Sequence, residues 1–146
     1  MRNLLPYSYK IPGYSLLIAG TVMTYLYFVV NIRLEIPVPA IISSFTETKF
    51  FTTYKTNFAD ELTILFLISG FSLIVFSKEK NESGQLRELR ISSLNKTIVT
   101  DICILLFATL FIYGSGYMAI IIMNLFLPFI IYLIYFNVEK RKLIKT

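Results

Sequence analysis

Several polar residues lie at the start of long apolar runs or within them, and their types limit the chemistry that the chain could perform. These residues are Asp60, Glu61, Ser69, Asp101 and Asn124. Asp60 and Glu61 open the apolar part of the stretch TNFADELTILF. Paired carboxylates can share a proton or a cation, but acids are also favourable in the first turn of a helix. We expect helix capping, with Asn57 as the N-cap, and retain an ion site as the alternative.

Asp101 is the most informative of these polar residues. It follows Lys96 by five positions, roughly 7 Å into the membrane if Lys96 marks the boundary. Thr97, Asp101 and Ala108 share one small or polar helix face, which is predicted to turn inward. Since no basic residue lies at that depth in another apolar run, we expect a hydrated carboxylate or one reached by a lysine. A proton relay, or a base supplied by another chain, is the alternative.

Asn124 and Pro128 act together in the last apolar run. Proline cannot donate the hydrogen bond that would reach the carbonyl of Asn124, so a kink is predicted here. The freed carbonyl and the side-chain amide could bind a ligand or bond to a neighbouring helix. We favour helix adhesion, with Ser69 as the expected contact of Asn124 because the two lie at similar depth.

Composition excludes several classes of function. The chain has no histidine, and Cys103 is its only cysteine. A disulfide within the chain, a zinc site of the Cys/His type, and serine–histidine or cysteine–histidine catalysis are therefore excluded. We expect no catalytic, cofactor-binding or metal-binding residue, and hence no enzyme. The net charge of +5 comes without any nucleic-acid-binding motif, so no nucleic-acid partner is expected.

Four apolar runs define the predicted architecture. The chain is 55% hydrophobic, with a mean hydropathy of +0.67, and a helix needs about 20 apolar residues to cross a bilayer. The qualifying runs are residues 13–31, 59–77, 97–114 and 117–136. We predict an all-α membrane protein whose residues 1–146 form a single four-helix transmembrane domain. Ser15, Ala19 and Gly20 make a small-residue patch that favours close helix packing.

The distribution of basic residues predicts the orientation. Eleven of the 14 Lys and Arg residues lie in the amino-terminal segment, in the loop between the second and third runs, or in the carboxyl-terminal tail. The positive-inside rule then places both termini in the cytoplasm. The loop between the second and third runs is interpreted as a topology anchor, with docking of a cytoplasmic protein as the alternative. Residues from Gly84 onward could extend the third helix.

The outer loop, residues 32–58, is predicted to contain a short amphipathic helix lying on the membrane surface. Ser44 and Glu47 fit a capping box, and Phe50, Tyr54 and Phe58 recur every four residues. The alternative is a cap over the helices or a docking surface for a partner, in which Phe50 and Tyr54 would be contact residues.

Four short motifs carry a family resemblance. NFADEL, FSKEKNES, LRELRISSL and MNLF resemble a family of small bacterial four-span integral membrane proteins with the pattern F-x-D-E-L, F-S-K-E-K and L-R-x-x-S-L. The similarity covers residues 57–126 and departs at MNLF, where Leu125 replaces a methionine. The resemblance implies four spans and a multi-pass location in the bacterial inner (plasma) membrane. It implies no activity, and no residue role is carried over.

The sequence favours a role through interaction. The expected function is a small accessory subunit or regulator of a larger membrane protein, whose partners are the lipid bilayer and another membrane protein or a second copy. The alternative is a small proton- or cation-coupled transporter or channel, possibly homo-oligomeric. Its polar ladder would run from Asp60 and Glu61 through Ser69 and Asn124 to Asp101.

Overall fold

The computed structural model describes residues 4–43, 48–80 and 82–145. The fold is about 70% helical, with five α-helices and one small antiparallel sheet in this part of the chain. The elements in order are a 3-10 turn η1 (Tyr7–Tyr9), α1 (Lys10–Phe28), β1 (Glu35–Ser43), β2 (Lys49–Asn57), α2 (Ala59–Val75), α3 (Gly84–Phe111), α4 (Ser115–Asn124) and α5 (Leu127–Lys145).

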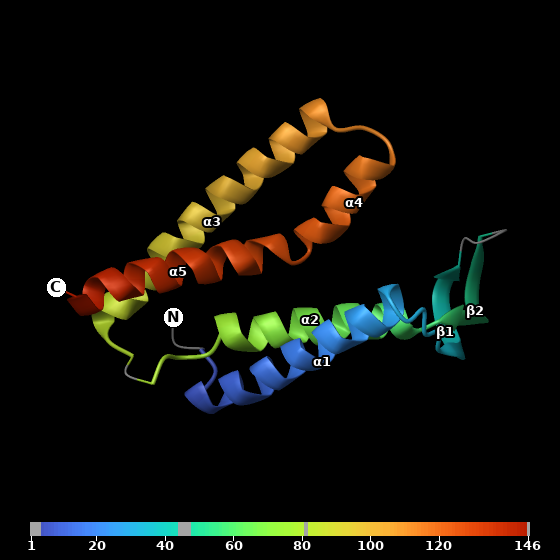
Figure 1. Ribbon diagram of the computed structural model, residues 1–146, viewed down its shortest axis with the longest axis horizontal. Helices are drawn as coiled ribbons and strands as arrows, with labels where there is room; N and C mark the ends of the chain where they lie inside the picture. Colours follow the sequence, from blue (N-terminus) through green and yellow to red (C-terminus); the bar gives the residue numbers. More distant parts are fainter. Residues whose placement is uncertain (1–3, 44–47, 81, 146) are drawn as a thin grey trace.

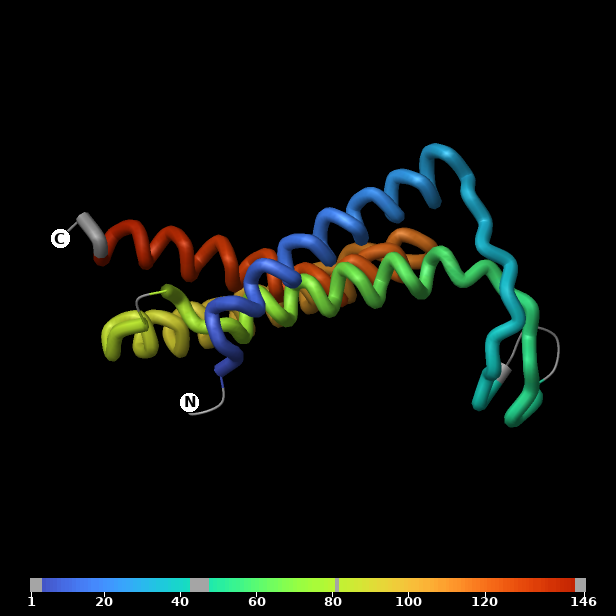
Figure 2. Tube along the Cα trace, turned by 90° about the horizontal axis from the view of Figure 1, so that it is seen from below, coloured from blue at the N-terminus to red at the C-terminus, as the bar shows by residue number. Residues whose placement is uncertain are grey.

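The helices form two antiparallel pairs. Helix α1 packs along α2, and α3 packs along α5, while α2 and α5 join the two pairs. Figures 1 and 2 agree that α1 begins and α5 ends at one end of the molecule, which also carries the α2–α3 linker. The β-hairpin projects from the opposite end. We call these the linker end and the hairpin end.

Two helical stretches are long and apolar enough to cross a membrane. They are Tyr7–Phe28 and Gly84–Phe111, and the bent pair α4–α5 makes a third if it counts as one span. Helix α2 has 17 residues, about 26 Å at 1.5 Å per residue, against a hydrocarbon core of about 30 Å. The extension of the third predicted helix back to Gly84 is confirmed. The structure therefore supports a membrane protein but does not show four full spans.

The last predicted span is broken rather than continuous. Helix α4 ends at Asn124, α5 begins at Leu127, and their axes differ by 50°. The break is closed by short-range bonds from the Leu125 N–H to the Ile122 carbonyl and from the Phe126 N–H to the Met123 carbonyl. Pro128 lies in the first turn of α5, where its missing N–H is tolerated. The predicted kink is thus confirmed as a full interruption.

The predicted amphipathic helix in the outer loop is wrong. Residues Lys49–Asn57 form a strand that pairs with Glu35–Ser43, from Glu35 opposite Asn57 to Ser43 opposite Lys49. Phe50 and Tyr54 lie four positions apart, and an even spacing fits one face of a strand as well as one face of a helix. Threonine and aromatic residues between them favour the strand. The proposed capping box, Ser44 and Glu47, lies outside the described residues.

Helices α1 and α2 approach closely because glycines line their contact. A Cβ atom on Gly20 would lie 2.8 Å from Leu67 Cδ2, and one on Gly70 would lie 2.9 Å from the Leu17 backbone nitrogen. The small-residue patch predicted in the first span is therefore confirmed at Gly20. The buried apolar core lies elsewhere, at the linker end, and includes Val75, Leu86, Tyr132 and Phe136.

Candidate functional site

Asp101 has a partner within the chain. Asn124 Nδ2 donates to Asp101 Oδ1 over 2.8 Å, and both side chains are half-buried. The sequence predicts a hydrated carboxylate or one reached by a lysine, whereas the structure gives Asp101 an amide partner, and the predicted contact between Asn124 and Ser69 is wrong. Ser69 is exposed on α2. The break after Asn124 explains the difference, because it turns the end of α4 towards α3 instead of α2.

The pairing of Asp101 with Asn124 places a carboxylate beside interrupted backbone. The carbonyl of Asn124 loses its usual helical donor, because the residue four positions later is Pro128. Carboxylate and carbonyl oxygens together suit a proton or a monovalent cation, and broken helices often hold such sites in transporters. Thr97 and Ala108, predicted on the same face as Asp101, are buried as expected.

Asp60 and Glu61 lie in the first turn of α2, as expected, but the N-cap residue is Phe58 and makes no side-chain capping bond, so the prediction of Asn57 as the N-cap is wrong. Asn57 accepts from the N–H of Ala59 over 3.3 Å and from the N–H of Leu34 over 2.8 Å. The Asn57 side chain therefore connects the first residue of α2 to Leu34, the residue just before β1. Asp60 Oδ1 is buried without a hydrogen-bond partner among the described residues, whereas Glu61 is exposed.

The polar residues do not form the predicted ladder. Asp60 and Glu61 lie at the hairpin end of α2, Ser69 is exposed, and Asp101 contacts only Asn124 among the candidates. Within residues 4–43, 48–80 and 82–145, no group of three or more His, Cys, Asp or Glu side chains is placed to hold a metal ion. Asp101 and Asn124 remain as one compact polar pair.

Phe50 and Tyr54 lie on β2, within a hairpin that packs on little else. Phe50 is 65% exposed, and the neighbouring apolar residues Ile41, Ile42 and Phe51 are exposed by 69%, 61% and 85%. A two-stranded sheet is marginal by itself in water. Exposed apolar residues on such a sheet indicate a surface that contacts lipid or another protein.

Sequence reasoning missed a buried arginine at the linker end. Arg90 is 3% exposed, and its Nη1 donates to the Val75 carbonyl over 2.9 Å and to the Tyr132 hydroxyl over 3.3 Å. Its Nη2 donates to the Ser77 carbonyl over 3.3 Å and to Glu82 over 3.4 Å. The guanidinium thus caps the carboxyl end of α2, where unpaired carbonyls favour a cation.

Glu79, in the α2–α3 linker, joins the two helix pairs. It forms ion pairs with Lys10 of α1 and, over 2.7 Å, with Lys140 of α5. Burial alone would raise the pKa of Glu79. The hydrogen bonds and positive charges of both lysines lower it by more than burial raises it, so the pKa lies below its ordinary value of 4.5. Beside it, Leu5 exchanges backbone hydrogen bonds with Phe76 and Lys78.

One sequence signal could have identified Arg90. Leu86, Arg90, Ser93 and Thr97 recur at spacings of four, three and four, and all four are buried on one face of α3. The basic residues of this loop suit a topology anchor that meets anionic lipid headgroups, and that interpretation does not single out Arg90. A stripe that contains one arginine among small or apolar residues is better explained by burial on a helix face.

Comparisons with protein-family models, with curated proteins and with solved structures find no match to this chain. The resemblance to small four-span bacterial membrane proteins therefore stays a prediction.

Proposed function

We propose that this chain is a four-span protein of the bacterial inner membrane that acts as an accessory or regulatory subunit of a larger membrane protein. In this arrangement the linker end, with the amino and carboxyl termini, faces the cytoplasm, and the hairpin lies on the outer side. The excess of Lys and Arg in the segments at the linker end supports this orientation. Helix α2 and the bent pair α4–α5 would supply the spans beyond α1 and α3.

The projecting hairpin is the observation that carries the proposal. Its two strands pair only with each other among the described residues, so each has an outer edge of backbone groups. Pro37 and Pro39 lack an N–H and block the edge of β1. The edge of β2 keeps its donors and acceptors, which suits the addition of an extended segment from a partner.

The strand register identifies the backbone groups involved. Pro37 lies opposite Lys55, and Pro39 lies opposite Thr53. Since proline cannot donate, these are the pairs without cross-strand hydrogen bonds, and their partners direct N–H and C=O groups outward. The N–H groups of Thr53 and Lys55 are therefore the donors offered to a partner strand.

The experiment extracts the protein from its native membrane in mild detergent and measures the mass and stoichiometry of the particle. We expect a complex with a larger membrane protein in fixed ratio. Thr53→Pro should release that protein, because it removes an outward N–H without breaking a bond to β1. Thr53→Val keeps the N–H and should retain the partner.

Equal retention by Thr53→Pro and Thr53→Val would refute strand addition. A particle that contains this chain alone would refute the accessory role. The unfolding midpoint of each variant, measured in the same detergent, checks that the hairpin substitution has not disrupted the rest of the fold.

A second candidate, proton- or cation-coupled transport, is favoured by one observation. The Asp101–Asn124 hydrogen bond lies at the break between α4 and α5, on apolar helices. In proteoliposomes, Asp101→Asn should abolish coupled flux, whereas Glu35→Gln on the exposed hairpin should not change it. Unchanged flux in Asp101→Asn, or no flux in the unaltered protein, would rule out this candidate.

A further inference from the structure

We propose that the pocket at the base of the hairpin binds the phosphate of a phospholipid headgroup. The pocket has a volume of about 500 Å³ and lies between the carboxyl end of α1 and the adjoining parts of β1 and β2. We call it the hairpin-base pocket. Its polar lining includes Tyr27, Asn31, Arg33, Glu35, Lys55 and Asn57.

The pocket carries one uncompensated positive charge. The Nζ atom of Lys55 lies 3.7 Å from Oε2 of Glu35, so these two charges offset each other. Arg33 is exposed and forms no ion pair or hydrogen bond in the described part of the chain. Asp60 and Glu61, the nearby acids of α2, do not line the pocket. A guanidinium presents several N–H groups in a planar fork that matches phosphate oxygens.

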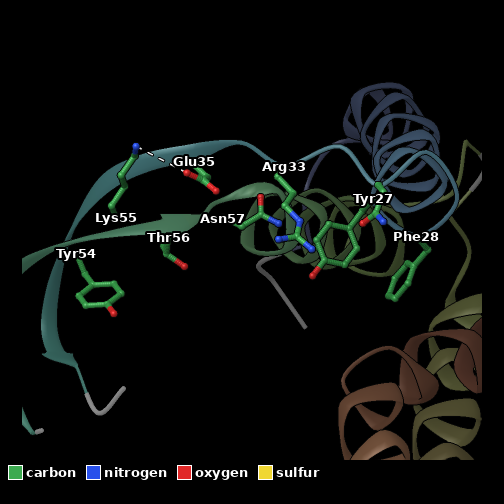
Figure 3. A pocket seen from close by; sticks show the side chains of 9 residues that line it. Tyr27, Phe28, Arg33, Glu35, Tyr54, Lys55, Thr56 and Asn57 are labelled. Carbon is green, nitrogen blue, oxygen red and sulfur yellow. Dashed lines mark ion pairs between the residues drawn. The ribbon is translucent and has the colours of Figure 1, made fainter. Parts of the chain in front are cut away.

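Neutral donors stand beside this guanidinium. Figure 3 shows Arg33 with the Asn57 carboxamide on one side and the Tyr27 ring on the other, all within one pocket. The oxygen of Asn57 is held by the N–H groups of Leu34 and Ala59. The Nδ2 group of Asn57 is thereby left as a hydrogen-bond donor beside the Arg33 guanidinium. Two donor groups side by side suit an anion, which can accept from both.

The position of the pocket indicates a lipid as the source of the anion. The apolar stretch Tyr7–Phe28 is one of the membrane-length helices, and it ends where the pocket begins. Phe28, Val29 and Val30 remain exposed, by 75%, 64% and 51%. Apolar side chains at this level meet acyl chains, so Arg33, a few residues beyond them, lies at the depth of the headgroups.

The test uses the full-length protein, delipidated in an uncharged detergent and titrated at constant ionic strength by calorimetry. The probes are dihexanoylphosphatidylglycerol, dihexanoylglycerol without a phosphate, and inorganic phosphate. We expect saturable binding of the phospholipid and none of the diacylglycerol. Arg33→Gln should weaken phospholipid binding at least tenfold, about 1.4 kcal/mol, because the phosphate loses its charged hydrogen-bond donor.

Two further variants separate recognition from general charge or misfolding. Asn57→Asp keeps the oxygen that accepts from Leu34 and Ala59 but replaces the Nδ2 donor with a negative charge, so it should also weaken phospholipid binding at least tenfold. Arg87→Gln removes an exposed arginine at the linker end and should bind the phospholipid as the unaltered protein does.

The outcomes divide clearly. Inorganic phosphate binding with the same dependence on Arg33 would keep the phosphate site but assign it to a soluble phosphate compound. Binding of the diacylglycerol as tight as that of the phospholipid would overturn the proposal. Equal losses in Arg33→Gln and Arg87→Gln, or normal binding by Asn57→Asp, would also overturn it.

Discussion

At the scale of single residues, Arg90 illustrates how a buried charge is accommodated. Its guanidinium meets two carbonyls at the end of α2, one hydroxyl and one carboxylate, and it lies 5.1 Å from the ring centroid of Phe136. A buried cation that loses its partners is costly, and so are carbonyls that lose their donor. The arrangement therefore ties the position of α3 to the end of α2.

We predict that Arg90→Met lowers the free energy of unfolding by roughly 3 kcal/mol, because two carbonyls and Glu82 lose a charged donor. Arg87→Met, three residues earlier and exposed on the same helix, should change it by less than about 0.5 kcal/mol. Chemical unfolding followed by circular dichroism in detergent measures both. Similar losses in the two variants would show that helix charge, and not the capping contact, is responsible.

The pair formed by Asp101 and Asn124 shows where residue-level prediction stopped. The sequence identifies both residues, since polar groups in apolar runs need a reason. Their contact does not follow from the sequence, because depth along straight helices places Asn124 level with Ser69. The break at Leu125 and Phe126 changes the direction of α4, and that change decides which helix Asn124 faces.

At the scale of elements, the α1–α2 pair depends on close backbone approach. Leu17 lies against Gly70, and Leu67 lies against Gly20, so each helix places a leucine into the gap left by a glycine of the other. Packing of this kind is common between helices in membranes, where lipid chains are as apolar as leucine and close contact supplies the attraction.

We predict that Gly70→Ala destabilises the protein by about 1–3 kcal/mol, because the added methyl group would meet the Leu17 backbone. Gly84→Ala is the matched control. No atom lies within 4 Å of the position of its added Cβ, so its stability should be unchanged or higher by up to about 1 kcal/mol. Thermal unfolding in detergent compares the two, and equal stability would contradict the close packing of α1 on α2.

The hairpin is the element that periodicity could not predict. Spacings of four residues satisfy the repeat of a helix and that of a strand, so Phe50 and Tyr54 could not decide between them. The local composition could have decided, because Thr52, Thr53 and Thr56 are β-branched. Pairing with β1 then supplies hydrogen bonds that no sequence pattern in β2 alone reveals.

At the scale of the whole molecule, the contacts that join the two helix pairs gather at the linker end. The buried apolar cluster of Val75, Leu86, Tyr132 and Phe136 lies near the linker end with Arg90 and Glu79, whereas α3 diverges from α5 toward the other end (Figure 1). The apolar runs were visible in the sequence and so was the grouping of basic residues. The joining of the runs through Glu79 was not, because it links residues that are far apart in the chain.

We predict that Glu79 makes stability depend on pH in the acidic range. Its folded pKa lies below 4.5, so the unfolded chain takes up a proton more readily and Glu79 stabilises the fold fully above that pH. The contribution is lost as pH falls through the folded pKa. Glu79→Gln should therefore melt lower than the unaltered protein at pH 7, and the difference should shrink below about pH 4.5.

Melting temperatures in an uncharged detergent across this range measure the effect. Glu35→Gln, which removes an exposed ion pair on the hairpin, should leave the pH dependence unchanged. Parallel pH profiles for Glu79→Gln and the unaltered protein would contradict a bridging role for this carboxylate.

The place of Glu79 in the chain also sets an order of events during synthesis. Lys10 precedes it by 69 residues and is already made when Glu79 appears, whereas Lys140 follows it by 61 residues. At a translation rate of roughly 5–20 residues per second, Lys140 is added to the chain about 3–12 s after Glu79. The ion pair between Lys10 and Glu79 can thus form while α5 is still being translated. The second carboxylate oxygen of Glu79 then stays available for Lys140.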